Sequence, residues 1–208
     1  MEIKNHWENV YATKTPEQVS WTQATPQTSL DLIATFQLPK SANIIDVGGG
    51  DSHLVDFLLE LGYQNITVLD VSGKALERAQ KRLGEKAKNV EWIECNILDF
   101  TPTKQYDLWH DRAAFHFLTS VEDIEKYVDT VSNFVCNGLC IATFSTEGPL
   151  KCSGLSISQY DEKKLCELFD NCFKKVACHT ENHTTPFDTK QNFLFCTFQK
   201  KIVKTEST

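Results

Sequence analysis

The chain has 208 residues, 41% of them hydrophobic and 24% charged, values typical of a single soluble globular domain. Its formal net charge of −7 argues against broad binding to nucleic acid, whose phosphate backbone requires a basic surface. No apolar run approaches the roughly 20 residues of a membrane span. The first residues lack the basic and then apolar pattern of a signal peptide, so we expect a cytoplasmic protein that does not bind membranes.

The N-terminal segment is predicted to cap the rest of the domain. A short helix is expected over 3–13, with Trp7 and Tyr11 four residues apart on one face. Trp21 follows in an irregular stretch, and an amphipathic helix is predicted over 28–36. The aromatic side chains either cover the sheet or form a flap that excludes water from a bound cofactor. On the second interpretation, Tyr11 and Trp21 contact the cofactor.

The core is organised around a glycine turn between a strand and a helix. The apolar run 43–47 predicts a buried strand, which ends at Gly48–Gly50 before a helix over about 52–61. Because glycine has no Cβ, a ligand can lie directly against such a turn. A second strand, 65–70, ends in Asp70, about 20 residues past the turn, where a carboxylate can accept hydrogen bonds from ribose hydroxyls. The pattern therefore predicts a site for an adenosine-containing cofactor.

Alternating strand and helix patterns continue along the chain. The predicted elements are a helix from Ser72 to about 83, strands over 90–93 and 106–109, a helix over about 121–135 closed by Gly138, and a strand over 139–144. A loop over 145–159 and a helix over 160–169 follow. The two apolar runs that come next, 172–178 and 192–198, are interpreted as an antiparallel pair.

Five strand–helix units predict an α/β fold with a Rossmann-like, doubly wound sheet of seven strands. The sheet is expected to be mostly parallel, with an antiparallel closing hairpin and with helices on both faces. We divide this single domain into a cap (1–40), a cofactor-binding core (41–145), a substrate loop with the closing hairpin (146–199) and a polar, frayed tail (200–208). Ligands of such sheets bind beyond the carboxyl ends of the strands, where the strand order reverses.

The cysteines and histidines do not point to a metal site. Eight cysteines lie next to apolar residues and never form a Cys-x-x-Cys pair, so we interpret them as reduced core residues. His179 and His183 invite a metal interpretation, but four positions along a strand separate them by about 13 Å, too far to bind one ion. No metal is expected.

The glycine turn does not match the pattern of nicotinamide enzymes. A dinucleotide site favours Gly-x-Gly-x-x-Gly, whereas the three glycines here are followed by Asp51, Ser52 and His53. Tyr160 and Lys164 have the Tyr-x-x-x-Lys spacing of short-chain dehydrogenases, but the expected upstream serine is absent, so we interpret the pair as chance. A Walker A lysine is also absent, which argues against an NTPase.

Four motifs together resemble the class I S-adenosylmethionine-dependent methyltransferases over about residues 40–145. They are Asp46-Val47-Gly48-Gly49-Gly50, Asp70, Cys95-Asn96-Ile97 and Tyr106-Asp107-Leu108. Three further segments are similar to a subgroup of small methyltransferases: 109–118, 152–155 and 183–193. The resemblance implies S-adenosylmethionine as cofactor and S-adenosylhomocysteine as product. It also implies that the cofactor is bound by Asp46, Gly48, Gly49, Gly50, Asp70, Val71, Asn96 and Ile97. Asn96 is the candidate to accept a hydrogen bond from the adenine amine, and Asp99 is a weaker candidate for the same role.

The cofactor brings its own reactive group, because a sulfonium makes its methyl carbon electrophilic. The protein then has to hold a nucleophile in line with the C–S bond and, for a protonated nucleophile, to supply a base. Asp111, His116 and His183 are the candidate catalytic residues, and we favour Asp111 as the ligand of the cofactor's ammonium group. The candidates for the substrate pocket are His110, Arg112 and Cys152.

We therefore expect a methyltransferase that acts on a nitrogen, oxygen or sulfur nucleophile of a small molecule. Methylation of a protein lysine is the nearest alternative. A nicotinamide-dependent oxidoreductase and a cofactor-binding scaffold without activity are the alternatives from other classes. The residues do not specify the acceptor atom or the oligomeric state.

Overall fold

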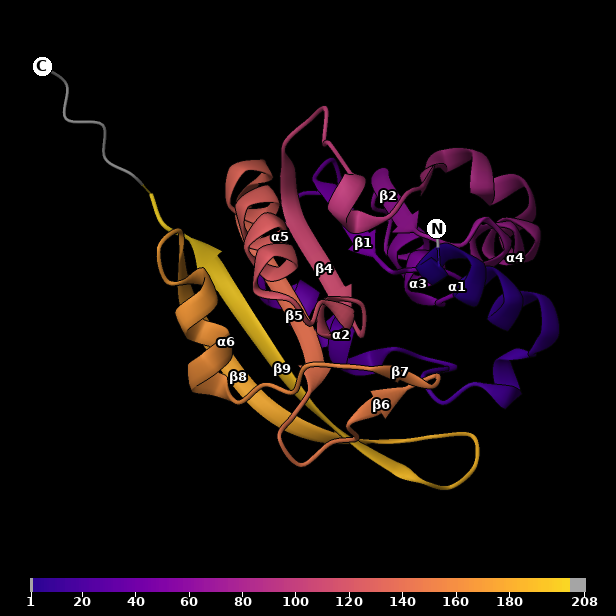
Figure 1. Cartoon of the computed structure of the whole chain (residues 1–208). Coiled ribbons are helices and arrows are strands. Elements are labelled where there is room, and N and C mark those ends of the chain that lie inside the picture. Colours follow the sequence, from indigo (N-terminus) through magenta and orange to yellow (C-terminus); the bar gives the residue numbers. More distant parts are fainter. Residues whose placement is uncertain (1, 203–208) are drawn as a thin grey trace, which may run out of the picture.

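The computed structural model describes residues 2–202, which form a seven-stranded sheet covered by helices on both faces (Figure 1). The strand order is β3-β2-β1-β4-β5-β9-β8. The parallel strands are β1 (Asn43–Val47), β2 (Asn65–Asp70), β3 (Val90–Glu94), β4 (Tyr106–Arg112) and β5 (Val135–Phe144). The last two strands are β8 (Phe173–Thr184) and β9 (Lys190–Lys200), and β9 pairs antiparallel with both β5 and β8. The predicted Rossmann-like sheet with its antiparallel closing hairpin is confirmed.

Alternation along the inner strands divides the core into two layers. Ile45 and Trp109 face one layer and Ile44 and Leu108 face the other. The first layer is covered by α5 (Val121–Phe134) and α6 (Glu162–Phe169). The second is covered by α2 (Gln27–Thr35), α3 (Leu54–Glu60) and α4 (Gly73–Leu83). Because both faces of these strands are buried, their sequences are nearly continuous apolar runs.

The strand order reverses between β1 and β4, and the site lies at this edge of the sheet. The N-terminal helix α1 (Glu2–Thr13) packs against α4 near the same edge (Figure 1). The cap predicted at the N-terminus therefore lies close to the carboxyl ends of β1 and β2. None of the helices described within residues 2–202 is long and apolar enough to cross a lipid bilayer.

The errors in the predicted elements lie mostly at their ends. β4 runs on to Arg112, and β8 and β9 include most of the connection between the two apolar runs, which leaves only 185–189 as a turn. The predicted loop contains a small hairpin, β6 (Lys151–Cys152) and β7 (Leu155–Ser156). Lys200, which was assigned to the tail, ends β9, and residues 203–208 of that tail lie outside the described residues.

Gly138 was predicted to close α5, but it lies inside β5, which follows the helix directly at Val135. Its role is close packing against α2. A Cβ at this position would lie 2.5 Å from the ring of Phe36, a distance that requires a neighbour to shift. The glycine therefore lets the end of α2 approach the sheet.

The prediction that all eight cysteines are reduced is wrong for one pair. Cys178 of β8 and Cys196 of β9 are directly opposite in the strand register, with Cα atoms 4.2 Å apart, and they form a disulfide. The partners are 18 residues apart in the chain and become neighbours only through strand pairing. Cysteine spacing therefore gave no signal for them.

Candidate functional site

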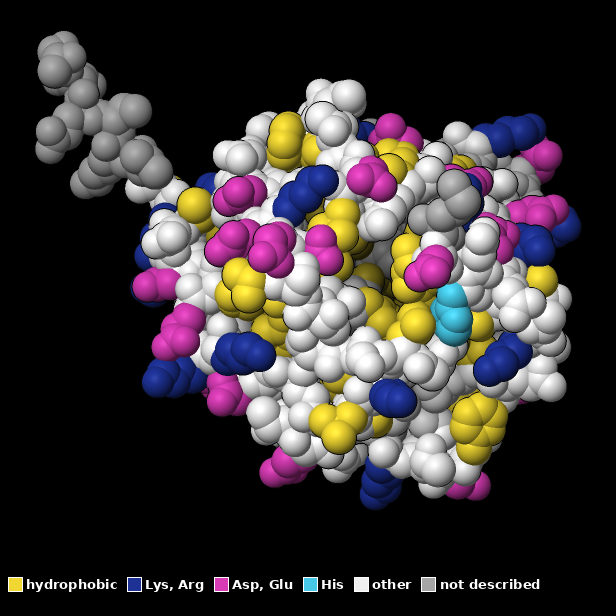
Figure 2. All heavy atoms as spheres, viewed as in Figure 1, with side chains coloured by type: hydrophobic (Ala, Val, Ile, Leu, Met, Phe, Trp, Pro, Cys, Tyr) yellow, Lys and Arg dark blue, Asp and Glu magenta, His cyan; other side chains and the backbone are white. Residues whose placement is uncertain are grey.

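A cavity of about 460 Å³ opens beyond the carboxyl ends of β1, β2 and β4. It lies where the strand order reverses, the usual position of ligands in doubly wound sheets. Figure 2 shows a hollow in the middle of this face of the molecule, with hydrophobic side chains on its walls. Its size falls within the range of about 300–1,000 Å³ that is usual for small-molecule sites.

The cavity brings together most of the residues singled out in the sequence. From the predicted cofactor set, it is lined by Tyr11, Trp21, Asp46, Gly48, Gly49, Asp70, Val71, Asn96 and Ile97. The three residues predicted for the substrate pocket also line it, namely His110, Arg112 and Cys152. Four predicted residues are not part of its wall, namely Gly50, Asp111, His116 and His183.

The glycine turn is the floor of the cavity. Gly48 and Gly50 have positive φ values, +66° and +43°, which favour glycine over residues with a Cβ. The amides of Gly48 and Gly49 donate to the carbonyl oxygen of Leu69 at 2.8 and 3.3 Å, which fastens the turn to the end of β2. A Cβ on Gly50 would lie 2.9 Å from Oδ2 of Asp70. Gly50 therefore contributes by leaving room for Asp70 rather than by lining the cavity.

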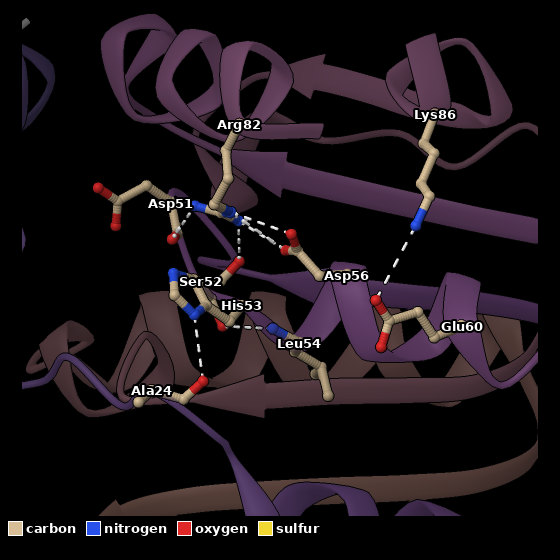
Figure 3. Close-up of polar contacts among 9 residues, drawn as sticks. All are labelled: Ala24, Asp51, Ser52, His53, Leu54, Asp56, Glu60, Arg82 and Lys86. Carbon is tan, nitrogen blue, oxygen red and sulfur yellow. Dashed lines mark hydrogen bonds and ion pairs between the residues drawn. The ribbon is translucent and has the colours of Figure 1, made fainter. Parts of the chain in front are cut away.

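Arg82 of α4 holds the outer end of this turn (Figure 3). It donates to the carbonyl oxygens of Asp51 at 2.8 Å and Ser52 at 2.7 Å. The same guanidinium contacts both carboxylate oxygens of Asp56, at 3.1 and 2.8 Å. Arginine suits this position because its planar fork can donate several hydrogen bonds at once. No motif in the sequence pointed to Arg82, because its contacts depend on how α3 and α4 pack.

Replacing Arg82 by glutamine is expected to weaken binding of S-adenosylhomocysteine about tenfold, because the turn must then be ordered when the ligand binds. Isothermal titration calorimetry measures the change. Lys86→Gln is the matched control on the same side of the domain. Lys86 pairs with Glu60 only at 3.9 Å, and both side chains are about 60% exposed, so its loss should leave the affinity within twofold. Equal affinities for the two variants would contradict the role of Arg82.

Asp70 ends β2 at the cavity wall and is only 6% exposed. Its Oδ1 accepts a hydrogen bond from the amide of Ser72 at 2.8 Å, which leaves Oδ2 available. Burial raises the pKa of Asp70 to about 7; the bond from Ser72 opposes this shift, and the carboxylates of Asp46 and Asp51 add to it. A ligand that donates hydrogen bonds to Oδ2 would stabilise the charged form.

Aromatic side chains from the cap cover the cavity. Trp7 lies 5.6 Å from Trp21 and 5.2 Å from Phe117 between ring centroids, and Tyr11 lies 6.3 Å from Trp21. All four side chains line the cavity. The sequence had suggested Tyr11 and Trp21 as cofactor contacts and Trp7 as part of the same flap, but it had not assigned Phe117 to the site. Their clustering encloses the ligand position in apolar surface.

Asn96, the candidate for the adenine amine, lines the cavity at the end of β3. Its Oδ1 accepts a hydrogen bond from the amide of Leu98 at 3.1 Å. A carbonyl oxygen has a second lone pair, so this contact leaves one acceptor position. Asp99, the weaker candidate for the same role, is exposed and does not line the cavity.

Three buried side chains of the cavity wall, Asp46, His110 and Ser29, are joined by hydrogen bonds. His110 Nδ1 lies 2.7 Å from Oδ1 of Asp46, and His110 Nε2 lies 2.9 Å from the hydroxyl of Ser29. With the ring neutral, its Nδ1–H donates to the Asp46 carboxylate, and Nε2 then accepts from Ser29. Ser29 was not predicted. The one signal for it is a polar residue four positions before Ile33 on the buried face of α2.

Asp111 lies outside the cavity, so the structure does not support its predicted contact with the cofactor's ammonium group. Its Oδ1 accepts from the amides of Ala114 and Phe115, both at 3.0 Å, and its Oδ2 accepts from the hydroxyl of Tyr127 at 2.8 Å. Burial raises the pKa of Asp111 to about 6, despite these hydrogen bonds. The carboxylate organises the chain after β4.

His116 and His183 are not positioned as bases either. His116 is fully buried and stacks on Phe144, and burial, with a smaller effect of Arg112, lowers its pKa to about 3. His183 Nε2 lies 2.7 Å from the carbonyl oxygen of Ser20, to which it donates. This bond attaches the closing hairpin to the cap. Both side chains therefore support the walls from behind.

Comparison with known proteins finds a family match in the central part of the chain. The family described as "Methyltransferase domain" matches residues 44–138. Nodulation protein S of Bradyrhizobium diazoefficiens is 30% identical over 88 residues, which cover 42% of this chain and 41% of that protein. The alignment thus spans less than half of the length of this curated relative.

Two solved structures share the fold over nearly the whole chain. The N-methyltransferase NodS of Bradyrhizobium japonicum, bound to S-adenosylhomocysteine, has a TM-score of 0.72 at 13% identity and covers 96% of this chain and 98% of that one. The 1,6-didemethyltoxoflavin N1-methyltransferase of Burkholderia thailandensis has a TM-score of 0.70 at 17% identity, with coverages of 96% and 88%. At these identities the likeness shows the fold alone.

Proposed function

Since residues 44–138 match a methyltransferase domain, we propose that the chain belongs to the class I S-adenosylmethionine-dependent methyltransferases and transfers the methyl group of this cofactor to a small molecule. The observation that carries the proposal is one cavity that joins the glycine turn, the carboxylate of Asp70 and the aromatic cover. The aromatic side chains narrow the access to this cavity, which favours a small acceptor over the side chain of a folded protein.

The residues present fit the cofactor. Gly48 and Gly50, whose positive φ values favour glycine, leave the turn without side chains. Asp70 has an available oxygen for the ribose hydroxyls. Asn96 retains an acceptor for the adenine amine. When bound, the cofactor supplies an electrophilic methyl carbon, and the chain then has to orient the acceptor and exclude water.

Of the three histidines in the candidate sets (His110, His116 and His183), His110 is the one whose position supports a role in proton transfer, although it was predicted for the substrate pocket. Asp46 orients its ring, and Nε2 faces the hydroxyl of Ser29, which also lines the cavity. A proton leaving the acceptor can pass to the oxygen of Ser29 while the proton of that hydroxyl passes to Nε2 of His110. The resulting imidazolium would be stabilised by the carboxylate of Asp46.

His110→Gln is expected to lower the rate of methyl transfer about 100-fold or more for an acceptor that arrives protonated, with binding of S-adenosylhomocysteine changed less than twofold. Single-turnover kinetics at saturating cofactor measure the rate. His179→Gln is the matched control, because His179 is exposed on β8 and does not line the cavity. A full rate in the His110 variant would exclude this side chain as the proton acceptor.

The proposal itself is tested in two steps. Calorimetry compares S-adenosylhomocysteine with NADH, and only the first should bind at micromolar concentration. The protein is then incubated with tritiated S-adenosylmethionine, a panel of small metabolites and a cell extract, and label is counted in the small-molecule and protein fractions. Label in the protein fraction alone would favour a protein methyltransferase. Binding of NADH instead would overturn the assignment.

A further inference from the structure

Arg112 is a cationic side chain in the wall of the cavity that the proposed methyl transfer does not yet explain. It ends β4 and lines the cavity together with Cys152 of the β6–β7 hairpin. Its Nη1 donates to the carbonyl oxygen of Trp21 at 3.1 Å. Its guanidinium carbon lies 4.9 Å from the centroid of the Phe193 ring, close enough for a cation–π contact. These two contacts fix the orientation of the planar group.

The remaining donors of Arg112 have no partner. Both Nε and Nη2 are shielded from solvent and make no hydrogen bond within the described residues. No carboxylate of the described residues forms an ion pair with Arg112 at 4.0 Å or less. A buried donor without a partner destabilises the folded protein, and more so when it is charged, so such groups call for an explanation.

Burial lowers the pKa of Arg112 to about 10, and the carboxylates of Glu181 and Asp46 oppose this shift without forming an ion pair with the guanidinium. Asp46 is engaged by His110, and Glu181 accepts a hydrogen bond from Thr28. Burial raises the pKa of the Cys152 thiol to about 11, although Arg112 opposes this shift, so the thiol stays neutral. The two remaining titratable neighbours are His116 and His183, and burial together with Arg112 lowers the pKa of each.

We propose that Arg112 is the receptor for a carboxylate on the methyl acceptor, which makes the substrate class a small carboxylic acid. The two unpartnered donors lie on adjacent nitrogens of one planar fork, the arrangement that binds both oxygens of a carboxylate. The apolar surface of Trp21 and Phe117 is available for the rest of the molecule. This inference rests on the proposed function and adds the chemical class of its substrate.

The amino-acid part of the cofactor also carries a carboxylate, and it could in principle reach the same guanidinium. The acceptor is the better assignment because Arg112 stands on the β5 and β9 side of the cavity, on the far side of the glycine turn from Asp70. The two sources are separable by experiment, since only one of them changes the affinity for S-adenosylhomocysteine when Arg112 is replaced.

The test measures binding of four carboxylates, namely acetate, 2-oxobutyrate, benzoate and indole-3-acetate, each against its neutral amide. Titrations followed by saturation-transfer NMR are run with and without S-adenosylhomocysteine, on the wild type, Arg112→Gln and Lys151→Gln. Lys151 is the matched control, because it is an exposed cation beside Cys152 that does not line the cavity. Calorimetry with S-adenosylhomocysteine is done on the same samples.

At least one carboxylate should bind the wild type and Lys151→Gln tenfold or more tightly than its amide, and Arg112→Gln should lose this preference. Its affinity for S-adenosylhomocysteine should stay within threefold of the wild type. A tenfold fall in that affinity would assign the guanidinium to the cofactor's carboxylate and overturn the inference. The inference would also be overturned if the wild type showed no preference for any carboxylate over its amide. This outcome does not depend on whether Arg112→Gln folds. Failure of the wild type to bind S-adenosylhomocysteine would instead overturn the proposed function. The carboxylate titrations run without S-adenosylhomocysteine would then still show whether Arg112 binds a carboxylate.

Discussion

Asp70→Asn is expected to weaken binding of S-adenosylhomocysteine about 10- to 100-fold at pH 8, as measured by calorimetry. The variant keeps the shape of the side chain and its acceptor for the Ser72 amide, but it removes the charge. A hydrogen bond to a charged group contributes about 1.5–3 kcal/mol, and ribose hydroxyls would donate to this carboxylate. Asp99→Asn is the control, because Asp99 is exposed and outside the cavity wall.

The same substitution should stabilise the protein in the absence of ligand. The pKa of Asp70 rises from 3.8 to about 7 on folding, chiefly through burial. A group with a raised folded pKa stabilises the native state fully below its unfolded pKa, and this contribution is lost as pH rises through the folded pKa. Asparagine cannot ionise, so Asp70→Asn should gain on the order of 2–4 kcal/mol in free energy of unfolding at pH 8. Urea denaturation should show a smaller gain at pH 5.

Ligand affinity should follow the ionisation of Asp70. In the wild type only about one tenth of the carboxyl groups are ionised one unit below a pKa of about 7. Binding of S-adenosylhomocysteine should therefore weaken about tenfold between pH 8 and pH 6, and the Asp70→Asn variant should lack this dependence. Unchanged affinity in the variant would show that Asp70 does not serve the ribose. A variant that is less stable than the wild type at pH 8 would show that folding does not raise the pKa of Asp70.

The cofactor side of the site was predictable because its signals are local. A buried strand, a glycine turn and a helix follow one another within 43–61, and Asp70 closes the next strand. Once strands 43–47 and 65–70 are taken as parallel neighbours, both carboxyl ends must lie at one edge of the sheet. That geometry placed Asp46, Gly48 and Asp70 together before any side-chain contact was known.

The predicted end of β4 was wrong, and this error affects the candidate catalytic residues. The apolar run predicted a strand that ends at Trp109, but β4 continues to Arg112, and successive side chains of a strand point to opposite faces. His110 and Arg112 consequently line the cavity, while Asp111 between them points into the core toward Tyr127. An error of three residues at one strand end thus concealed that Asp111 lies outside the cavity.

Other parts of the site depend on packing between distant segments. Ser29 reaches His110 across 81 positions, and Arg112 donates to Trp21 across 91. No periodicity or motif encodes such contacts, because they follow from how the cap lies on the sheet. The contact between Ser29 and His110 is accordingly one that sequence reasoning did not find.

Gly48→Ala is expected to lower the free energy of unfolding by about 2–4 kcal/mol and to reduce S-adenosylhomocysteine binding at least 100-fold. Two effects add at this position. Its φ of +66° is unfavourable for alanine by about 1 kcal/mol, and the new Cβ would lie 2.5 Å from Cβ of Ala114. Overpacking of a well-filled site typically costs about 1–3 kcal/mol, and here relief requires the turn itself to move.

Two further variants separate the effects. Gly62→Ala has a φ of +86° with no atom within 4 Å of the new Cβ, so it should lose only about 1 kcal/mol and bind the ligand normally. The double variant Gly48→Ala/Ala114→Gly removes the atom that is struck, so it should recover part of the stability and affinity lost in Gly48→Ala. A coupling of more than about 0.5 kcal/mol in this double-mutant cycle is expected for residues in contact. If Gly48→Ala is as mild as Gly62→Ala, the turn accommodates a side chain, and a ligand lying directly against its backbone is no longer required.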